Sequence, residues 1–298
     1  MTDEAGLPWP QILLHVSREE VETAEQALFE AGALSVSFLD ENDQPVLEPA
    51  PGEVRLWDEL QLVALFAQGE TASAVKTAVC RALGVDSLPD NAFSLVPDRQ
   101  WERVWMDRFQ PMKFGRRLWV CPTHLEPPEP EAVNLRLDPG LAFGTGTHAT
   151  TALCLEWLDS AELEGKRLLD FGCGSGVLAI AALLLGASAV AATDIDPQAM
   201  QASRSNAELN RVDGQLNLVL AQELVDNQYD ILLANILFQP LCELRDLFAG
   251  ILPANATIVM SGILEEQVSS LQAHYSGLFK LDTVITRDGW ARVSGTRI

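Results

Sequence analysis

The sequence predicts an α/β protein whose larger part is a doubly wound, mostly parallel sheet, preceded by a smaller α+β domain. Three observations lead to this prediction. Residues 166–196 read as a strand, a glycine turn, a helix and a second strand, which is the βαβ unit of Rossmann-like sheets. Apolar segments typical of buried strands and helices continue to alternate after this unit. Residues 1–97 instead show the order βαββαβ, which is typical of a ferredoxin-like domain.

The first 97 residues alternate short apolar strands with two helices. Their periodicity predicts strands at residues 11–15, 34–39, 60–66 and 92–96 and helices at residues 18–31 and 71–83. The polar, proline-rich stretch between the second and third strands predicts a loop. Because this region holds no group of residues suited to catalysis, we interpret it as a substrate-recognition domain. A purely stabilising role is the alternative.

Residues 98–117 connect the two parts and differ in composition from the domain before them, with six basic against three acidic residues. Four apolar residues at helical spacing predict one face of an interdomain helix: Trp101, Val104, Trp105 and Phe109. Such a face is usually packed in a core. The sharper hypothesis is that Trp101 and Trp105 also border a substrate channel. The catalytic domain is then expected to span residues 118–298.

The βαβ unit contains a glycine turn between its first strand and its helix. Residues 167–171 have the bulky apolar character of a buried parallel strand. The turn contains Gly172, Gly174 and Gly176, whose missing side chains let backbone N–H groups approach a ligand closely. The helix is expected over residues 177–185, followed by a second strand that ends at Asp194. This carboxylate is placed to accept hydrogen bonds from the ribose of an adenosine-type ligand.

The residue just before the turn, Asp170, distinguishes between possible ligands. Gly174, Gly176 and Ala179 satisfy the loose dinucleotide fingerprint, so an NAD-dependent oxidoreductase is one alternative. An anionic carboxylate is unfavourable beside a pyrophosphate but favourable beside an ammonium or sulfonium group. The pattern Asp-x-Gly-x-Gly-x-Gly therefore fits a cationic nucleoside better than a dinucleotide, and S-adenosylmethionine is the common one.

Four sequence motifs resemble those of known methyltransferases. Asp170-Phe-Gly-Cys-Gly-Ser-Gly176 resembles motif I of the class I S-adenosylmethionine-dependent methyltransferases. The loop within Leu137–His148, the segment Asp194-Ile-Asp-Pro197 and Ala234-Asn-Ile-Leu237 together resemble the ribosomal protein L11 methyltransferase family. The resemblance is strongest between residues 137 and 237. It implies methyl transfer from S-adenosylmethionine to lysine side-chain and N-terminal amines of a large-subunit ribosomal protein.

The resemblance implies a role for Thr145, and the positions of three further residues in the predicted elements indicate roles for them. Thr145 is expected to contact the methionine end of the cofactor, and His148 either caps the following helix or borders the substrate channel. Asn235 follows a predicted strand at residues 229–234 and is expected beside the cofactor, where it acts as the catalytic residue. Its segment resembles the Asn-Pro-Pro-Tyr motif of amine-directed methyltransferases, and the amide oxygen can orient an attacking nitrogen. Asp196 is expected to cap the helix that begins at Pro197.

Composition limits the remaining possibilities. The net charge of −22 repels phosphate backbones and favours a basic protein substrate, although solubility alone also explains it. Nucleobase methylation, which the Asn235 segment also suggests, is opposed by this charge. The five cysteines show no zinc-like spacing, so no metal is expected. Without a signal-like start or a long apolar run, we expect a cytoplasmic monomer that contacts neither membrane nor nucleic acid directly.

Overall fold

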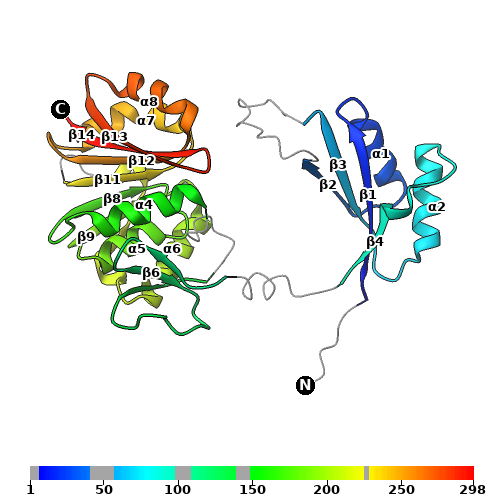
Figure 1. Cartoon of the computed structure of the whole chain (residues 1–298), viewed down its shortest axis with the longest axis horizontal. Helices are drawn as coiled ribbons and strands as arrows, with labels where there is room; N and C mark the ends of the chain where they lie inside the picture. Colours follow the sequence, from blue (N-terminus) through cyan, green and yellow to red (C-terminus); the bar gives the residue numbers. More distant parts are fainter. Residues whose placement is uncertain (1–6, 41–56, 98–108, 139–147, 225–227) are drawn as a thin grey trace. The chain divides into compact units, whose positions relative to one another are not determined.

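The fold is taken from a computed structural model, which describes residues 7–40, 57–97, 109–138, 148–224 and 228–298. The chain divides into two compact units, Met1–Val104 and Trp105–Ile298 (Figure 1). Each unit has its own sheets and its own buried apolar core.

The N-terminal unit is an antiparallel sheet of order β2-β3-β1-β4 with two helices. Its elements are β1 (Trp9–Ser17), α1 (Val21–Glu30), β2 (Ser35–Asp40), β3 (Glu59–Leu65), α2 (Ala72–Leu83) and β4 (Phe93–Val96). Alternate residues of β1 and β3, including Ile12, Leu14, Leu60 and Leu62, are buried in one core with residues of α1 and α2. The order of elements and strands confirms the predicted ferredoxin-like arrangement.

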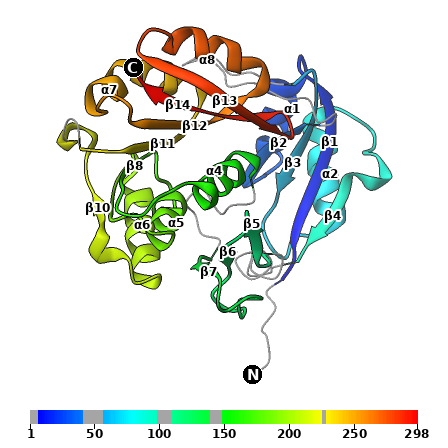
Figure 2. The ribbon, with the colours of Figure 1, turned by 60° about the vertical axis from the view of Figure 1, so that its left-hand side comes forward.

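The C-terminal unit is built on a seven-stranded sheet of order β10-β9-β8-β11-β12-β14-β13. Its strands are β8 (Arg167–Phe171), β9 (Ala189–Thr193), β10 (Leu216–Leu218), β11 (Ile231–Asn235), β12 (Thr257–Leu264), β13 (Phe279–Arg287) and β14 (Trp290–Arg297). The first five strands of this order pair in parallel, and β14 runs antiparallel between β12 and β13. Figure 2 shows the β13–β14 hairpin beside β12. The predicted doubly wound, mostly parallel sheet is confirmed.

Helices cover both faces of this sheet (Figure 1). On one face lie α4 (Ala149–Ser160), α5 (Val177–Leu184) and α6 (Pro197–Leu209), and on the other lie α7 (Phe238–Ile251) and α8 (Val268–Tyr275). Short 3-10 turns occur at Asp90–Ala92, Asp213–Gln215, Ala221–Glu223 and Glu265–Gln267. Seven of the eight α5 residues are buried, which explains why its sequence lacks a polar face.

A small separate sheet precedes α4. It contains β5 (Met112–Phe114), β6 (Leu118–Cys121) and β7 (Val133–Arg136), and β5 pairs antiparallel with β6. The prediction of a helix and linker through residue 117 is therefore wrong over β5. Phe109 is buried in the core of the C-terminal unit. Trp101 and Trp105, with the rest of the predicted interdomain helix up to residue 108, lie outside the described residues.

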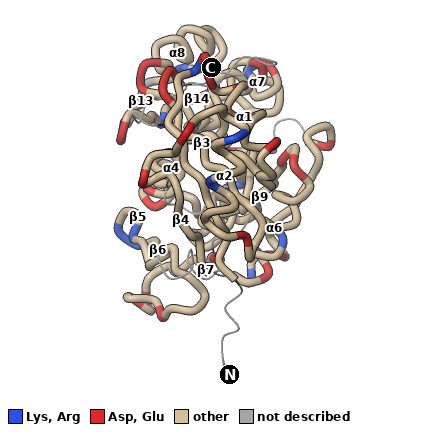
Figure 3. The backbone as a smooth tube through the Cα atoms, turned by 90° about the vertical axis from the view of Figure 1, so that its right-hand side faces the viewer, with Lys and Arg blue, Asp and Glu red and all other residues tan. Residues whose placement is uncertain are grey.

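The charged residues are unevenly distributed over the C-terminal and N-terminal units. Acidic positions recur along many elements, while basic positions gather just after and within β5, at Lys113, Arg116 and Arg117 (Figure 3). Within the described part of the chain, no helix has the length and apolar character needed to span a bilayer.

Candidate functional site

A pocket of about 370 Å³ opens at the carboxyl ends of β8, β9 and β11. In doubly wound sheets this edge is where ligands bind, because the loops after the strands diverge there. The lining comes from the glycine turn, the end of β9, the end of β11 and the first turns of α4 and α7. It includes Phe171, Gly172, Gly174, Asp194, Asn235 and Leu237. The structure therefore brings three predicted groups of site residues together.

The glycine turn and Asp194 form one hydrogen-bonded unit. Gly172, Gly174 and Gly176 all have positive φ angles, which explains the requirement for glycine. The N–H of Gly174 donates to Asp194 Oδ2 at 2.9 Å, and the N–H of Asp196 donates to Asp194 Oδ1 at 3.0 Å. Each carboxylate oxygen keeps a second lone pair, so Asp194 can still accept from a ligand hydroxyl. Gly172 and Gly174 line the pocket, whereas Gly176 packs against Ser203 of α6.

Asp170 lies beneath this turn and is completely buried. Its Oδ2 accepts the N–H of Ala179 in α5 at 3.1 Å, and its Oδ1 has no hydrogen-bond partner. Burial raises the pKa of Asp170 to about 7, the Ala179 hydrogen bond opposes this, and the charge of Asp194 adds to it. Asp170 does not line the pocket. The expected direct contact between Asp170 and the cofactor stays a prediction, and this geometry favours an effect of its charge through the turn.

Asn235 ends β11 and lines the pocket. Its Nδ2 donates to the hydroxyl of Thr151 in α4 at 3.2 Å. Its Oδ1 is buried and has no hydrogen-bond partner among the residues that the structure describes. A buried acceptor without a donor is costly, so its presence here indicates a donor supplied by a ligand. The bond from its nitrogen to Thr151 fixes the orientation of the amide, so that its oxygen is turned to the other side.

The remaining predicted site residues give mixed outcomes. Thr145 lies outside the described residues. His148 caps α4, since its Nδ1 accepts from the N–H of Thr150 at 3.4 Å, and its ring lies edge-on to Trp290 with centroids 4.8 Å apart. A role for His148 in a substrate channel stays a prediction. Asp196 caps α6 as predicted, with its Oδ1 accepting from the N–H of Gln198 at 2.8 Å.

Several pocket residues were missed by reasoning from the sequence. Thr151 is 84 residues from Asn235 in the chain, but it lies three residues after His148, so one turn of helix separates it from the glycine-containing loop. Ile195 is 99% exposed although it is large and apolar, and it lines the pocket beside Asp194. An apolar residue between two aspartates at a strand end was the available signal. Leu237, Pro240 and Leu244 add an apolar wall from the α7 region.

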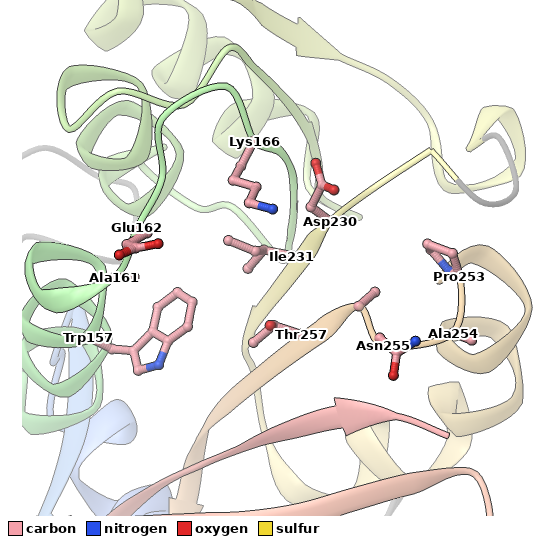
Figure 4. Close-up of a pocket in the computed structure, with 11 residues that line it drawn as sticks. Trp157, Ala161, Glu162, Lys166, Asp230, Ile231, Pro253, Ala254, Asn255 and Thr257 are labelled. Atoms are coloured by element: carbon pink, nitrogen blue, oxygen red, sulfur yellow. The ribbon is translucent and has the colours of Figure 1, made fainter.

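A second cavity, of about 420 Å³, lies at the opposite edge of the same sheet (Figure 4). It is lined at the starts of β8, β11 and β12 by residues that include Lys166, Asp230 and Thr257, together with Trp157 from α4. Lys166 and Asp230 are exposed. None of the buried, unpartnered polar atoms of the described residues belongs to this lining. The second cavity therefore lacks the features that single out the carboxyl-edge pocket.

A seven-stranded sheet of this order, with a glycine turn after β8 and an asparagine at the end of the neighbouring β11, defines a class I S-adenosylmethionine-dependent methyltransferase. The chain belongs to the Ribosomal protein L11 methyltransferase family, whose family model matches residues 8–298.

Individual relatives agree with this family. The chain is 50% identical over 292 residues to a ribosomal protein L11 methyltransferase of Pseudomonas aeruginosa (strain LESB58), covering 98% of this chain and 99% of the relative. It is 51% identical to one of Pseudomonas putida (strain W619), covering 98% and 100%. The crystal structure of a ribosomal protein L11 methylase from Lactobacillus delbrueckii subsp. bulgaricus aligns with a TM-score of 0.59 and 31% identity, over 63% of this chain and 99% of that one. These relatives do not favour the NAD-dependent oxidoreductase or nucleobase methyltransferase alternatives.

Proposed function

We propose that this protein transfers methyl groups from S-adenosylmethionine to amines of ribosomal protein L11, on lysine side chains and at the N-terminus. The observation that carries the proposal is the buried, unpartnered Oδ1 of Asn235 in the pocket beside the glycine turn. An amine donates an N–H hydrogen bond and attacks with its lone pair, so an acceptor at this point orients the nucleophile. The full-length match to relatives that carry the L11 methyltransferase name supports this substrate.

The residues of the pocket fit S-adenosylmethionine. Asp194 suits ribose hydroxyls, and the exposed side chain of Ile195 suits a flat apolar base. The buried carboxylate of Asp170 lies below the turn and favours a cation above it over a pyrophosphate. When bound, the cofactor supplies an electrophilic methyl group on a sulfonium. The chain's own residues have to bind it, exclude water and align the amine.

The amine must be neutral to attack. A lysine of pKa ~10.4 is deprotonated in only about one molecule in a few thousand at pH 7, which corresponds to about 4.6 kcal/mol. An apolar site lowers this cost because desolvation disfavours the ammonium form, and a neighbouring cation acts in the same direction. Phe171, Ile236 and Leu237 give the pocket this apolar character. Asn235 then accepts an N–H bond from the amine and aims its lone pair, so positioning contributes much of the rate.

A covalent mechanism through the pocket cysteine has no support in the site. Cys173 lines the pocket, but burial raises its pKa to about 12, so the thiol is protonated at neutral pH. We therefore propose direct transfer from cofactor to amine. The N-terminal unit is proposed to recognise the substrate protein, with the acidic surface attracting a basic partner. Because its proposed substrate is a ribosomal protein, we also propose that the enzyme acts in the cytoplasm, and a monomer stays our expectation.

The test uses the full chain, purified L11 and S-adenosylmethionine labelled in its methyl group. Label in L11, located by peptide mass spectrometry on lysine and α-amino nitrogens, is the expected result. Ribosomal RNA is the control acceptor and is expected to remain unlabelled. Label in RNA with none in L11 would refute the proposed function and select the nucleobase alternative.

A further inference from the structure

The residue after Asn235 is held from two sides by glycines that are far apart in the sequence. Ile236 lies between Gly172 of the glycine turn and Gly262 of β12. A Cβ at Gly172 would collide with the side-chain Cγ2 of Ile236. A Cβ at Gly262 would lie 2.7 Å from the carbonyl carbon of Ile236, 3.0 Å from its nitrogen and closer still to its oxygen. Gly262 therefore meets the main chain of Ile236, which no change of rotamer can move away.

Gly262 occupies a β-bulge that lies level with Asn235. Asn235 pairs with Ser261 across the β11–β12 ladder. The register between β12 and β14 shifts between Met260 and Ile263, and Gly262 there has a φ of +85°. A bulge with a positive φ bends its strand and re-aims the backbone locally. At this bend, Gly262 lies against the main chain of Ile236, the residue that follows Asn235.

The two segments in this contact, β12 at Gly262 and the chain at Ile236, differ in how easily they can be displaced. Ile258, Met260 and Ser261 are completely buried in a strand with neighbours on both sides, and the Ser261 hydroxyl donates to the Ala291 carbonyl at 2.9 Å. The Ile236 corner instead leads to Leu237, which is 45% exposed and caps α7 without a side-chain hydrogen bond. A side chain at position 262 would therefore displace the segment around Ile236 and not strand β12.

We propose that Gly262 is a positioning residue for methyl transfer. Its missing side chain lets the Ile236 main chain rest against β12, and this contact fixes the place of the neighbouring Asn235 amide relative to the glycine turn. Gly262 does not line the pocket, so it acts only through the main chain of Ile236, the residue after Asn235. The inference rests on the methyl transfer proposed above and adds a residue to that site.

The test is Gly262→Ala in the full chain, assayed for L11 methylation at saturating cofactor. Ordinary Cβ contacts begin near 3.4 Å, so the corner has to shift by several tenths of an ångström or more. A misplacement of roughly 1 Å can lower a rate about 100-fold. We expect kcat to fall about 30- to 100-fold, while the Kd of S-adenosylhomocysteine, measured by calorimetry, changes less than about threefold, because Asp194 and its hydrogen bond from Gly174 make no contact with Gly262.

The matched control is Gly289→Ala. Gly289 has a φ of +78° and lies in the same sheet at the β13–β14 turn, and a Cβ added there would meet no atom of the described residues within 4 Å. The substitution introduces the same backbone strain without the contact, so its kcat is expected to stay near the wild-type value at a similar loss of Tm. A second variant, Ser261→Ala, loosens the bulge without a clash and is expected to lower kcat about threefold to tenfold, roughly the loss of one hydrogen bond.

The outcomes separate the alternatives. A Gly262→Ala enzyme with wild-type kcat, or one that loses cofactor binding in proportion to activity, would overturn the positioning role. If Gly262→Ala does not fold, Ser261→Ala decides the matter, and unchanged kcat in that variant counts against the proposal. An inactive wild-type chain would instead refute the proposed function, so the two failures are distinguishable.

Discussion

The two edges of the central sheet make an informative comparison. Each has a cavity of similar size, about 370 Å³ at the carboxyl ends of the strands and about 420 Å³ at the amino ends. Both are lined by residues at the ends of β8 and β11. At the carboxyl edge, Asn235 and Asp170 each keep a buried oxygen without a partner, whereas Lys166 and Asp230 at the amino edge are exposed to water.

Volume alone therefore does not identify the functional site in this protein. The carboxyl edge combines close backbone approach at the glycine turn with the desolvated oxygen of a pocket residue, Asn235, to which a ligand could supply a donor. Exposed charges at the amino edge are already solvated and gain little from a ligand. If desolvated polar atoms identify the functional site, substitutions at the carboxyl edge should change activity, ligand affinity or stability far more than equivalent substitutions at the amino edge.

The largest difference in kcat is expected between a substitution of Asn235 at the carboxyl edge and one of Asn255 at the amino edge. We expect Asn235→Ala to lower kcat about 100- to 1,000-fold, the range seen when one preorganised hydrogen-bonding group is removed from an active site. The Kd of S-adenosylhomocysteine should change little, because Asp194 and the glycine turn remain. Steady-state methylation of L11 together with calorimetry measures both quantities.

The control at the amino edge is Asn255→Gly. Asn255 lines the second cavity and has a φ of +67°, which glycine adopts without strain. Its kcat is expected to match the wild type. Equal losses in the two variants, or an unchanged kcat in Asn235→Ala, would remove the distinction between the edges.

The next largest effect concerns Asp170 and pH. Its folded-state pKa of about 7 lies above the ordinary value of 3.8, so the folded state retains a proton that the unfolded state has released. The contribution of Asp170 to stability is thus complete below pH 4 and is lost as pH rises to about 7. Between pH 5 and 8 this loss is on the order of 2 kcal/mol, from ~1.36 kcal/mol for each pKa unit.

Asp170→Asn should abolish that part of the pH dependence, so the variant gains stability relative to the wild type as pH rises. Urea unfolding at pH 5 and pH 8, without ligand, measures the difference. Glu162→Gln removes one exposed carboxylate at the amino edge and controls for net charge. Parallel pH profiles for Asp170→Asn and the wild type would show that the buried carboxylate is not protonated as described.

Reasoning from the sequence succeeded where a signal is local. The glycine turn, the strand that ends at Asp194 and the Asp196 cap are all set by neighbouring residues, and the structure contains each of them. The ferredoxin-like order also followed from local periodicity. Strand β5 was missed because three residues are too few to show a period of two, and its pairing with β6 decides its conformation.

Contacts between distant segments could not be predicted in the same way. The sequence predicts a contact between Asp170 and the ligand, which stays a prediction, but it does not predict the hydrogen bond from the N–H of Ala179, because the direction of a side chain at a strand end depends on the pleat and on the helix above it. Thr151 and Gly262 meet the Asn235 corner from 84 and 27 residues away, and nothing in a single sequence pairs them with it. Such pairings are fixed only by the order of strands in the sheet.

A smaller effect is expected at Asp194, on affinity and not on rate. Asp194→Asn keeps one oxygen for the Gly174 N–H but loses the acceptor for the Asp196 N–H and the charge that strengthens hydrogen bonds to ribose hydroxyls. We expect the Kd of S-adenosylmethionine to rise about tenfold, or ~1.4 kcal/mol, with kcat at saturation nearly unchanged. Asp196→Asn is the control, because asparagine caps a helix as well as aspartate does. A fall in kcat without a change in Kd for Asp194→Asn would contradict the assignment to ribose.

The smallest effect is expected for Thr151→Val, which removes the acceptor that holds the Asn235 amide nitrogen. The amide can then rotate and present its nitrogen to the amine, so we expect kcat to fall about fivefold, or ~1 kcal/mol, the net value of one hydrogen bond. Thr151→Ser keeps the hydroxyl and should retain most of the rate. At the amino edge, Thr257→Val tests the same exchange in the lining of the second cavity and is expected to leave kcat unchanged. Equal rates for Thr151→Val and Thr151→Ser would mean that the Asn235 oxygen reaches the amine without this partner, since only orientation of the amide separates the two variants.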